Sequence, residues 1–490
     1  MATTSEPAAG HEQGLQARAI GFWGALAMSV AAMGPLLGAL GVAPLIVGEA
    51  GFSAPFIFVI CWIAMVAVAL TIGRFTRLLP GAASIYSYVA HGLGERLGFL
   101  TGWLSFSYYV LFVPLLMTAF GIYAEAAAAD VFGISVTWWI WSLLGMAIVF
   151  GLAMTGIALS MRIDLALAVI ADGFLLLVSA VIIAKVIGDG AFTLEPLAPT
   201  NAPGDFTGLS LAIAFGVLIF LGFEQSFVLG EETTDPKGNV PKAIYTSLAL
   251  VGFVLFLSTF ALVLGFGERG MVRLGDLLAS EGTPWFALVR ERIGSGWVDV
   301  LQVMIVFSIL SNTIASTNSV TRIQYGMGRA HALPRQFGWT RARERTPYVA
   351  IIVTTAVAVA ITLIPGLVWS PVATFAFLGF GVGFAAAVSF ILINIAALWY
   401  APRAGDGAPA WRSYAVPVVA IVILIPVVYT SFYPSPGYPL KWAPWVAIGW
   451  LALGVVYLLW REHRHERIDV DYTFGEGRGE PPAPTTPTPA

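Results

Sequence analysis

The chain has 490 residues, of which 58% are hydrophobic and only 11% charged, and its formal net charge is −3. About 25% of the residues of soluble globular proteins are charged. This composition, with a mean hydropathy of +0.83, therefore excludes an ordinary soluble protein. The single cysteine, Cys61, excludes an internal disulfide and a cysteine-based metal site.

Apolar segments of membrane-spanning length recur along the chain. Each reaches or approaches the ~20 residues needed to cross ~30 Å of hydrocarbon. In chain order, as TM1 to TM12, they occupy approximately residues 20–47, 52–79, 98–127, 135–155, 161–187, 208–231, 242–266, 297–327, 346–365, 371–399, 415–433 and 442–461. The sequence therefore predicts an all-α polytopic membrane protein with 12 transmembrane helices. Because residues 1–19 are polar and the first apolar run is too long for a signal-peptide core, we expect no cleavable signal peptide.

The distribution of Lys and Arg predicts the orientation. If both termini are cytoplasmic, 19 of the 25 Lys and Arg residues lie inside and 6 lie outside, as the excess of positive charge on cytoplasmic loops requires. Four of the six outside lie in the connection 267–296, together with four acidic residues. We expect that connection to form an amphipathic external helix.

Two of the segments are interrupted. In TM1, Gly34-Pro35 breaks the apolar run, and in TM6, Gly216 and Gly222 are followed by Glu224. A glycine costs about 1 kcal/mol in a helix interior, and a carboxylic acid at membrane depth costs at least ~2.5 kcal/mol. Interrupted segments in corresponding positions of two halves indicate a transporter's binding site. The alternative for Gly34-Pro35 is a packing kink alone.

Two connections have distinctive compositions. After TM2, Pro80-Gly81 breaks the chain, and the aromatic run SIYSYV at 84–89 predicts a short helix lying in the membrane interface. After TM8, residues 318–345 are rich in arginine, which predicts a cytoplasmic connection.

TM8 has a polar stripe. Its small and polar residues recur at spacings of three and four, which places them on one face of a helix. They are Ser308, Ser311, Asn312, Ala315, Ser316 and Ser319. Such stripes are often packing faces, so two interpretations stay open: packing alone, or a face that lines water or an ion.

Two acids lie at membrane depth, where an ionisable residue is a functional hypothesis by default. Glu224 could couple proton entry to substrate movement, or it could be a neutral acid that bridges TM6 to backbone groups. Asp172, in the middle of TM5, could accept a proton or bind a cation with Ser316 and carbonyls of TM1. Its alternative role is that of a neutral structural acid.

Three stretches resemble signatures of one family. They are PGAASIY at 80–86 with GFLTGW at 98–103; GFE at 222–224 with EETTDP at 231–236 and VPKA at 240–243; and the stretch 318–334, with Arg322, Tyr325, Gly328-Arg329 and Leu333-Pro334, followed by Thr346-Pro347. In this order they resemble the amino acid–polyamine–organocation (APC) superfamily, on its amino acid permease side. The resemblance covers about residues 20–460.

The resemblance implies a LeuT-type fold, a 5+5 inverted repeat with broken TM1 and TM6. The first repeat, TM1–TM5, would occupy residues 20–207 and the second, TM6–TM10, residues 208–402, with TM11–TM12 at 403–461 outside the repeat. Residues 1–19 and 462–490 would be cytoplasmic tails, the second disordered because it is rich in Pro and Thr. Some family members have a lysine in the part of TM5 that holds Asp172 here, so their lysine-based mechanism cannot be carried over.

The implied substrate site lies between TM1 and TM6, flanked by TM3, TM8 and TM10. Free N–H groups at a half-helix start suit a substrate carboxylate, and the candidates are the backbones of Met33, Gly34, Leu36, Leu37 and Gly38. Unwound carbonyls suit the ammonium group, and the candidates are those of Phe215, Gly216, Ile219 and Phe220. The candidate side-chain pocket residues are Tyr109, Phe112, Phe220, Phe223 and Phe375, each of which could instead be a core residue. The family's TM1 break is usually richer in Gly and Ser than Leu36-Leu37.

The resemblance and the two breaks predict a secondary active transporter that moves amino acids, neutral or apolar, across the plasma membrane by alternating access. We expect coupling to H+ rather than Na+, and a monomer or homodimer in the lipid bilayer. The alternatives are a transporter for a polyamine or other organic cation, and an amino acid exchanger. A membrane enzyme is disfavoured because all five His lie in tails or connections. No catalytic residue, metal, cofactor or nucleic acid is expected.

Overall fold

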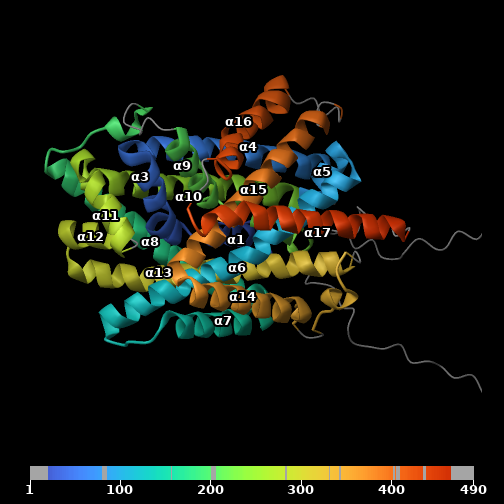
Figure 1. Cartoon of the computed structure of the whole chain (residues 1–490), viewed down its shortest axis with the longest axis horizontal. Coiled ribbons are helices and arrows are strands. Elements are labelled where there is room, and N and C mark those ends of the chain that lie inside the picture. Colours follow the sequence, from blue (N-terminus) through green and yellow to red (C-terminus); the bar gives the residue numbers. More distant parts are fainter. Residues whose placement is uncertain are drawn as a thin grey trace, which may run out of the picture.

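The computed structural model describes residues 20–79, 85–155, 157–199, 206–281, 284–329, 332–341, 344–400, 403, 409–433 and 437–464. Within these ranges the regular secondary structure is helical, apart from one isolated parallel bridge between Ile20 and Thr233. Figure 1 shows the long helices α6 (Glu95–Phe132), α7 (Trp138–Met154), α13 (Ser295–Arg329) and α14 (Tyr348–Val368) running side by side, and they contact one another.

Nine helices in the described part of the chain are long and apolar enough to cross a membrane. One of these, the interrupted stretch Phe22–Leu78, covers both TM1 and TM2, and two further predicted segments coincide with the shorter apolar helices Trp138–Met154 and Leu211–Ser226. The remaining long helices are α8 (Ile157–Gly188), α10 (Pro236–Phe266), α15 (Pro371–Tyr400), α16 (Val416–Thr430, preceded by the π-helical turn η8, Trp411–Ala415) and α17 (Ala443–His463).

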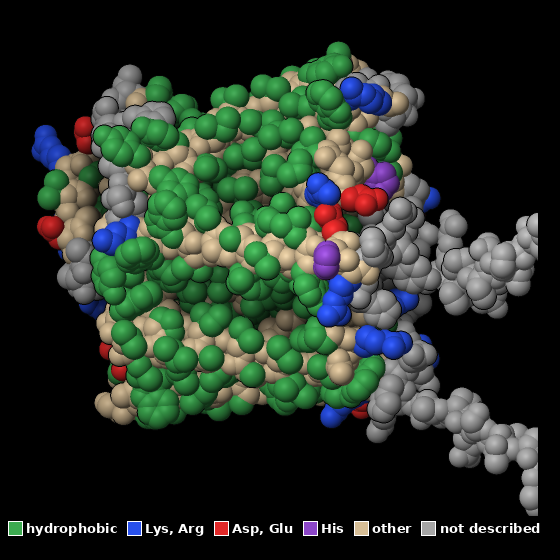
Figure 2. Space-filling model, turned by 45° about the vertical axis from the view of Figure 1, so that its right-hand side comes forward, with side chains coloured by type: hydrophobic (Ala, Val, Ile, Leu, Met, Phe, Trp, Pro, Cys, Tyr) green, Lys and Arg blue, Asp and Glu red, His purple; other side chains and the backbone are tan. Residues whose placement is uncertain are grey.

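The outer surface is that of a membrane protein. Figure 2 shows hydrophobic side chains covering most of the visible face, while Lys, Arg, Asp and Glu gather at its two ends. The C-terminal helices contribute many exposed apolar side chains, among them Val422, Ile425, Leu453 and Val456. A continuous apolar surface of this extent is stable only against hydrocarbon, so the chain is a multi-pass membrane protein.

The break predicted in TM1 is confirmed. Helix α1 (Phe22–Met33) ends where Gly34 adopts the left-handed conformation, with φ +55°. Pro35 restarts the helix as α2 (Pro35–Leu37), in the first-turn position where a missing N–H costs nothing. A π-helical turn, η1 (Gly38–Val42), then leads into α3 (Ala43–Ala50).

The interruption of TM6 is also confirmed. Helix α9 (Phe206–Leu218) is followed by a non-helical segment, 219–222, in which Gly222 has φ +111°. The chain continues as a 3-10 helix, η5 (Phe223–Glu232). Helix α10 begins at Pro236, earlier than the predicted start at 242, because Asp235 turns the chain in the left-handed conformation and Pro236 takes the first helical position.

The connections differ in part from the predictions. The stretch 267–296 forms two main helices, α11 (Met271–Glu281) and α12 (Pro284–Arg292), where one was expected. Arg273 of α11 pairs with Glu291 of α12, and its hydrogen bond holds the pKa of the Glu291 carboxyl below its ordinary value. After helix α4 (Ala54–Leu78), the predicted short helix exists as α5 (Ile85–Leu93), but Tyr86 and Tyr88 are buried in the protein. Pro80-Gly81 lies outside the described residues.

Candidate functional site

The two helix breaks lie directly against each other. A Cβ atom built on Gly222 would stand 2.4 Å from the carbonyl oxygen of Ala32 and 2.8 Å from the nitrogen of Met33. Beside this contact, the Ser29 hydroxyl donates to the carbonyl of Phe223 at 3.0 Å. The backbone of α1 thus touches the backbone of the unwound TM6 segment with no side chain between them, and only glycine fits at 222.

At the TM1 break, two of the five predicted N–H groups are left for a ligand. The N–H of Gly34 bonds to the carbonyls of Val30 and Ala31, and that of Gly38 bonds to Gly34. Met33 belongs to α1 and has its helical partner four residues earlier. Leu36 and Leu37 form the first turn of the restarted helix, where N–H groups have no partner in their own helix.

At the TM6 break, two of the four predicted carbonyls accept a hydrogen bond within the described part of the chain and two do not. The carbonyl of Phe215 accepts from the N–H of Ile219 at 3.0 Å, and that of Phe220 accepts from Phe223 at 3.5 Å. The carbonyls of Gly216 and Ile219 accept no hydrogen bond among the described residues. The break therefore leaves two strong acceptors close to the end of α9.

The polar stripe of TM8, now on α13, packs on both breaks. Asn312 lies against Gly34, since a Cβ on that glycine would be 2.2 Å from the Asn312 Nδ2. Ser316 donates to Asn312 Oδ1 at 3.2 Å, and Ser319 donates to Oε1 of Gln225 at 2.8 Å. The stripe therefore contacts TM1 at one end and TM6 at the other, and Ser316 lies next to the residue that packs on the TM1 break.

Glu224 is fully buried, with 0% of its surface exposed. Its Oε1 accepts from the hydroxyls of Tyr109 at 3.2 Å and Tyr108 at 3.5 Å, and its Oε2 accepts from the N–H of Gly222 at 3.1 Å. The acid therefore joins the unwound segment of TM6 to α6. Tyr108 was not among the predicted site residues, and its position directly before Tyr109 is the local sequence feature that indicates it.

Asp172 of α8 is 9% exposed, and neither of its buried carboxyl oxygens has a hydrogen-bond partner among the described residues. The N–H of Leu36 faces this carboxyl without meeting the geometry of a hydrogen bond. Because helix α8 contacts α1, α2 and α13, Asp172 lies at the TM1 break, whereas Glu224 is held by α6.

The predicted pocket aromatics do not form a single cluster of ring contacts. Phe220 packs against Phe58 of α4, and Phe223 against Phe390 of α15, with ring centroids 5.1 and 5.9 Å apart. Phe375 lies beside the π-helical turn η1 of TM1, where it and the hydroxyl of Tyr123 approach Gly41. Phe112 is buried on α6, and Gly216 packs against Cys61 of α4. Tyr123 was missed because nothing near it in the sequence marks it.

Hydrogen bonds to other segments lie on both sides of the two breaks. Towards the predicted outside, the buried Trp285 of α12 donates its indole N–H to the carbonyl of Ala39 in η1 at 2.9 Å. Towards the predicted inside, Ile20 bonds through its N–H to the carbonyl of Glu232, and Thr234 bonds back to Ile20. Among the described residues, no three His, Cys, Asp or Glu side chains lie close enough together to hold a metal ion.

Comparison with known proteins gives one family match over most of the chain. The family model described as amino acid permease matches residues 20–457. The low-affinity putrescine importer PlaP of Escherichia coli (strain K12) is 25% identical over 309 residues, which are 62% of this chain and 66% of that protein, just under two thirds of its length.

Two further relatives are named for other substrates than putrescine. The branched-chain amino acid permease BcaP of Bacillus subtilis (strain 168) is 23% identical over 429 residues, covering 84% of this chain and 86% of that protein. The lysine-specific permease LysP of Lactococcus lactis subsp. cremoris (strain MG1363) is 24% identical over 314 residues, covering 60% of this chain and 59% of that protein.

Proposed function

The chain belongs to the amino acid permease family, which consists of transporters and not enzymes, and from this premise we propose that it is a secondary active transporter for amino acids. It would move a neutral or apolar amino acid across the plasma membrane by alternating access. The observation that best supports the proposal is the direct contact of the two broken helices at Gly222 and Ala32, because transporters bind substrates between such breaks.

The proposal includes the twelve-helix topology, with TM1–TM5 (20–207) and TM6–TM10 (208–402) as inverted repeats and TM11–TM12 (403–461) outside them. It also places both termini in the cytoplasm, since that choice puts 19 of 25 Lys and Arg residues inside. The two interrupted helices occupy equivalent positions, first in each repeat, which supports the pairing.

The substrate would bind through backbone groups at both breaks. The N–H groups of Leu36 and Leu37 would hold its carboxylate, and the carbonyls of Gly216 and Ile219 its ammonium group. The buried aromatics of α6 and TM6 would surround its side chain. No charged side chain is needed for either end of the amino acid, which leaves Glu224 and Asp172 available for coupling.

Neutral amino acids are expected to raise the unfolding temperature of the detergent-purified protein, because a ligand that binds only the folded state stabilises it by about 2.7 kcal/mol at 100 times its Kd. The measurement compares the common amino acids with putrescine at two pH values. A rise of the unfolding temperature with putrescine alone would mean that the substrate is a diamine and not an amino acid. Counterflow in proteoliposomes separates a carrier from a channel.

Glu224→Gln is expected to flatten the pH dependence of uptake, because an amide cannot take up or release a proton. The substitution keeps an oxygen that can accept from Tyr109 but loses the oxygen that accepts from the Gly222 N–H. If Glu224 is only a structural acid, the variant loses stability and keeps the wild-type pH profile. Asp172→Asn is the matched variant, and a flattened profile there alone would assign the proton to Asp172.

A diamine or other organic cation is the second candidate substrate, because a relative of this chain is a putrescine importer. Asp172 gives this candidate a structural basis, since its carboxyl oxygens are buried without a hydrogen-bond partner among the described residues. In that case Asp172→Asn would abolish putrescine binding, and not alter the pH profile of amino acid uptake. An exchanger without ion coupling would show uptake only from vesicles preloaded with substrate.

A further inference from the structure

Glycines at close helix contacts hold two groups of helices together. In the first group, a Cβ atom on Gly252 of α10 would overlap the Trp62 ring of α4. The Trp62 indole N–H also donates to the carbonyl of Leu248 in α10 at 3.0 Å. A Cβ atom on Gly216 of α9 would likewise overlap the Sγ of Cys61 in α4. Because interiors packed this closely do not deform continuously, we expect α4, α9 and α10 to move as one unit.

The second group consists of α5, α6 and α15. A Cβ atom on Gly92 of α5 would stand 2.7 Å from the carbonyl oxygen of Ala396 in α15. One on Gly98 of α6 would stand 2.7 Å from the Cα of Ala90 in α5. The backbones of these helices therefore touch with no side chain between them, and α15 also packs along α6. These three helices form a second unit.

The α4–α15 interface, Thr71 and Phe75 on α4 with Asn394 and Tyr400 on α15, joins the two units through side chains. The buried Thr71 hydroxyl donates to Oδ1 of Asn394 at 2.7 Å. The Phe75 ring stacks on Tyr400, with the ring centroids 5.8 Å apart. Among the described glycines, none brings α4 and α15 into backbone contact. Since water can replace a hydrogen bond at little net cost, the two units can separate more easily here than either unit can come apart.

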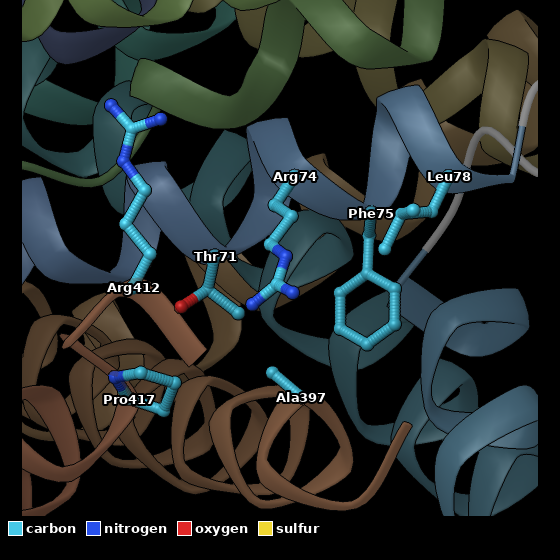
Figure 3. A pocket seen from close by; sticks show the side chains of 7 residues that line it. All are labelled: Thr71, Arg74, Phe75, Leu78, Ala397, Arg412 and Pro417. Atoms are coloured by element: carbon cyan, nitrogen blue, oxygen red, sulfur yellow. The ribbon is translucent and has the colours of Figure 1, made fainter. Parts of the chain in front are cut away.

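A small hollow shows that this interface is incompletely packed. In Figure 3, Thr71, Arg74 and Phe75 point from α4 towards Ala397 of α15, and these residues line the hollow. It encloses room for about one water molecule. Arg74 also donates from Nη1 to the hydroxyl of Ser413 at 3.0 Å, in the turn η8 that precedes α16. A water molecule in the hollow would lie beside Thr71, where it can replace the partner of the hydroxyl.

The α4–α15 interface also leads to the TM6 break. Asn394 Nδ2 donates to the carbonyl of Phe390, one turn earlier in α15, at 2.8 Å. The Phe390 ring packs on Phe223, which directly precedes Glu224. With both termini in the cytoplasm, as proposed above, Thr71 and Asn394 lie between this ring contact and the cytoplasmic ends of α4 and α15. Separation of the interface would therefore let water approach the TM6 break from the cytoplasm.

We propose that the cytoplasmic opening of the transport cycle forms along the α4–α15 interface, and that the hydrogen bond from Thr71 to Asn394 holds it closed. The inference rests on the alternating access proposed above. Because α9 and α10 belong to the unit of α4, the first half of TM6 moves with α4, while α15 stays with α6. Water then takes over the hydrogen bonds that Thr71 and Asn394 give up.

The reactivity of a cysteine placed at the hollow tests this proposal in the whole protein, reconstituted in proteoliposomes. Ala397→Cys is introduced together with Cys61→Ala, and its rate of modification by N-ethylmaleimide is measured without substrate. Thr71→Val is expected to raise this rate about 2- to 12-fold, the change in an equilibrium constant that follows from the loss of one buried hydrogen bond. Thr71→Ser keeps the hydroxyl and is expected to keep the rate of the parent protein.

Thr313→Val is the matched control, because the buried Thr313 hydroxyl donates to the carbonyl of Ile309 within its own helix, α13. The modification rate of Ala397→Cys is expected to stay unchanged in this control. An unchanged rate in Thr71→Val, or an equal rise in the control, would overturn the proposal.

A reversible cross-link tests the connection to transport. In Thr71→Cys/Asn394→Cys, again with Cys61→Ala, leucine counterflow is expected to stop when the two thiols are oxidised to a disulfide and to return on reduction. Counterflow that persists in the oxidised protein would contradict the proposal. Absence of leucine counterflow from the parent protein would contradict the proposed amino acid transport instead. The modification rates need no substrate, so they still decide the role of the interface in that case.

Discussion

Gly222→Ala is expected to abolish most of the transport, at least about tenfold, because the substitution adds an atom where two backbones touch. A non-glycine residue in a sparsely populated backbone region costs about 1–3 kcal/mol, and at φ +111° Gly222 is in such a region. The new Cβ would also stand 2.4 Å from the Ala32 carbonyl oxygen. No rotamer change relieves a contact with backbone, so TM1 and TM6 would have to separate.

Uptake in proteoliposomes and the unfolding temperature of the purified protein measure this effect together. Gly151→Ala is the matched control: Gly151 lies inside α7, and a Cβ there would meet no atom within 4 Å. That change is expected to leave transport intact and to stabilise the helix by up to about 1 kcal/mol. Wild-type uptake by Gly222→Ala would mean that the contact between the two breaks has no part in transport.

Arg322→Met is expected to lower the free energy of unfolding by about 3–5 kcal/mol, because removing one partner of a buried ion pair leaves the other charge buried alone. The side chains of Arg322 and Glu232 are only 4% and 2% exposed, and Nε and Oε2 are 2.5 Å apart. The Arg322 guanidinium also donates to the carbonyl of Asn318 at 2.9 Å. The pair joins the end of TM6 to α13 at the point where Ile20 bonds to Glu232.

The control is the exposed ion pair of Arg96 and Glu462, whose side chains are 74% and 37% exposed. Arg96→Met is expected to change the free energy of unfolding by no more than about 1 kcal/mol. In Arg322→Met/Glu232→Leu no unpaired charge remains, so this double variant should be less destabilised than the sum of the single ones. Denaturant unfolding in detergent measures Arg322→Met, Glu232→Leu, their double variant and Arg96→Met, and additive effects of the first two would show that the two side chains do not act as a pair.

Part of the site could be predicted from local sequence because its chemistry is local. Gly34-Pro35 must interrupt a helix wherever it occurs in an apolar run, since proline removes a hydrogen bond and glycine permits the left-handed turn. The same argument applies to the glycines before Glu224. The stripe on TM8 was equally visible, because its spacing alone places Asn312, Ser316 and Ser319 on one face.

Other features could not be predicted, because they join residues far apart in the chain. The bond from Ser29 to Phe223 spans 194 positions, and that from Tyr109 to Glu224 spans 115. The direction of a side chain was equally hidden: Phe220 was expected to face a substrate, and its ring packs against Phe58 of α4. Phe220→Ala tests whether part of the Phe220 ring still faces a ligand. If it does, the substitution is expected to change the substrate selectivity of uptake.

The sequence by itself determined that this chain lies in a membrane, where its helices are interrupted and which family it resembles. Length, hydrophobicity and the restrictions of Gly and Pro act within a few residues, so they can be followed along the chain. Only the tertiary structure decided which N–H and carbonyl groups stay free at the breaks, which acid faces which helix, and that Arg74 of α4 bonds to Ser413 of η8. These contacts result from the packing of helices that the sequence separates by up to 339 positions. Helix and turn propensities depend only on residues that are near one another in the chain, so they cannot predict such contacts.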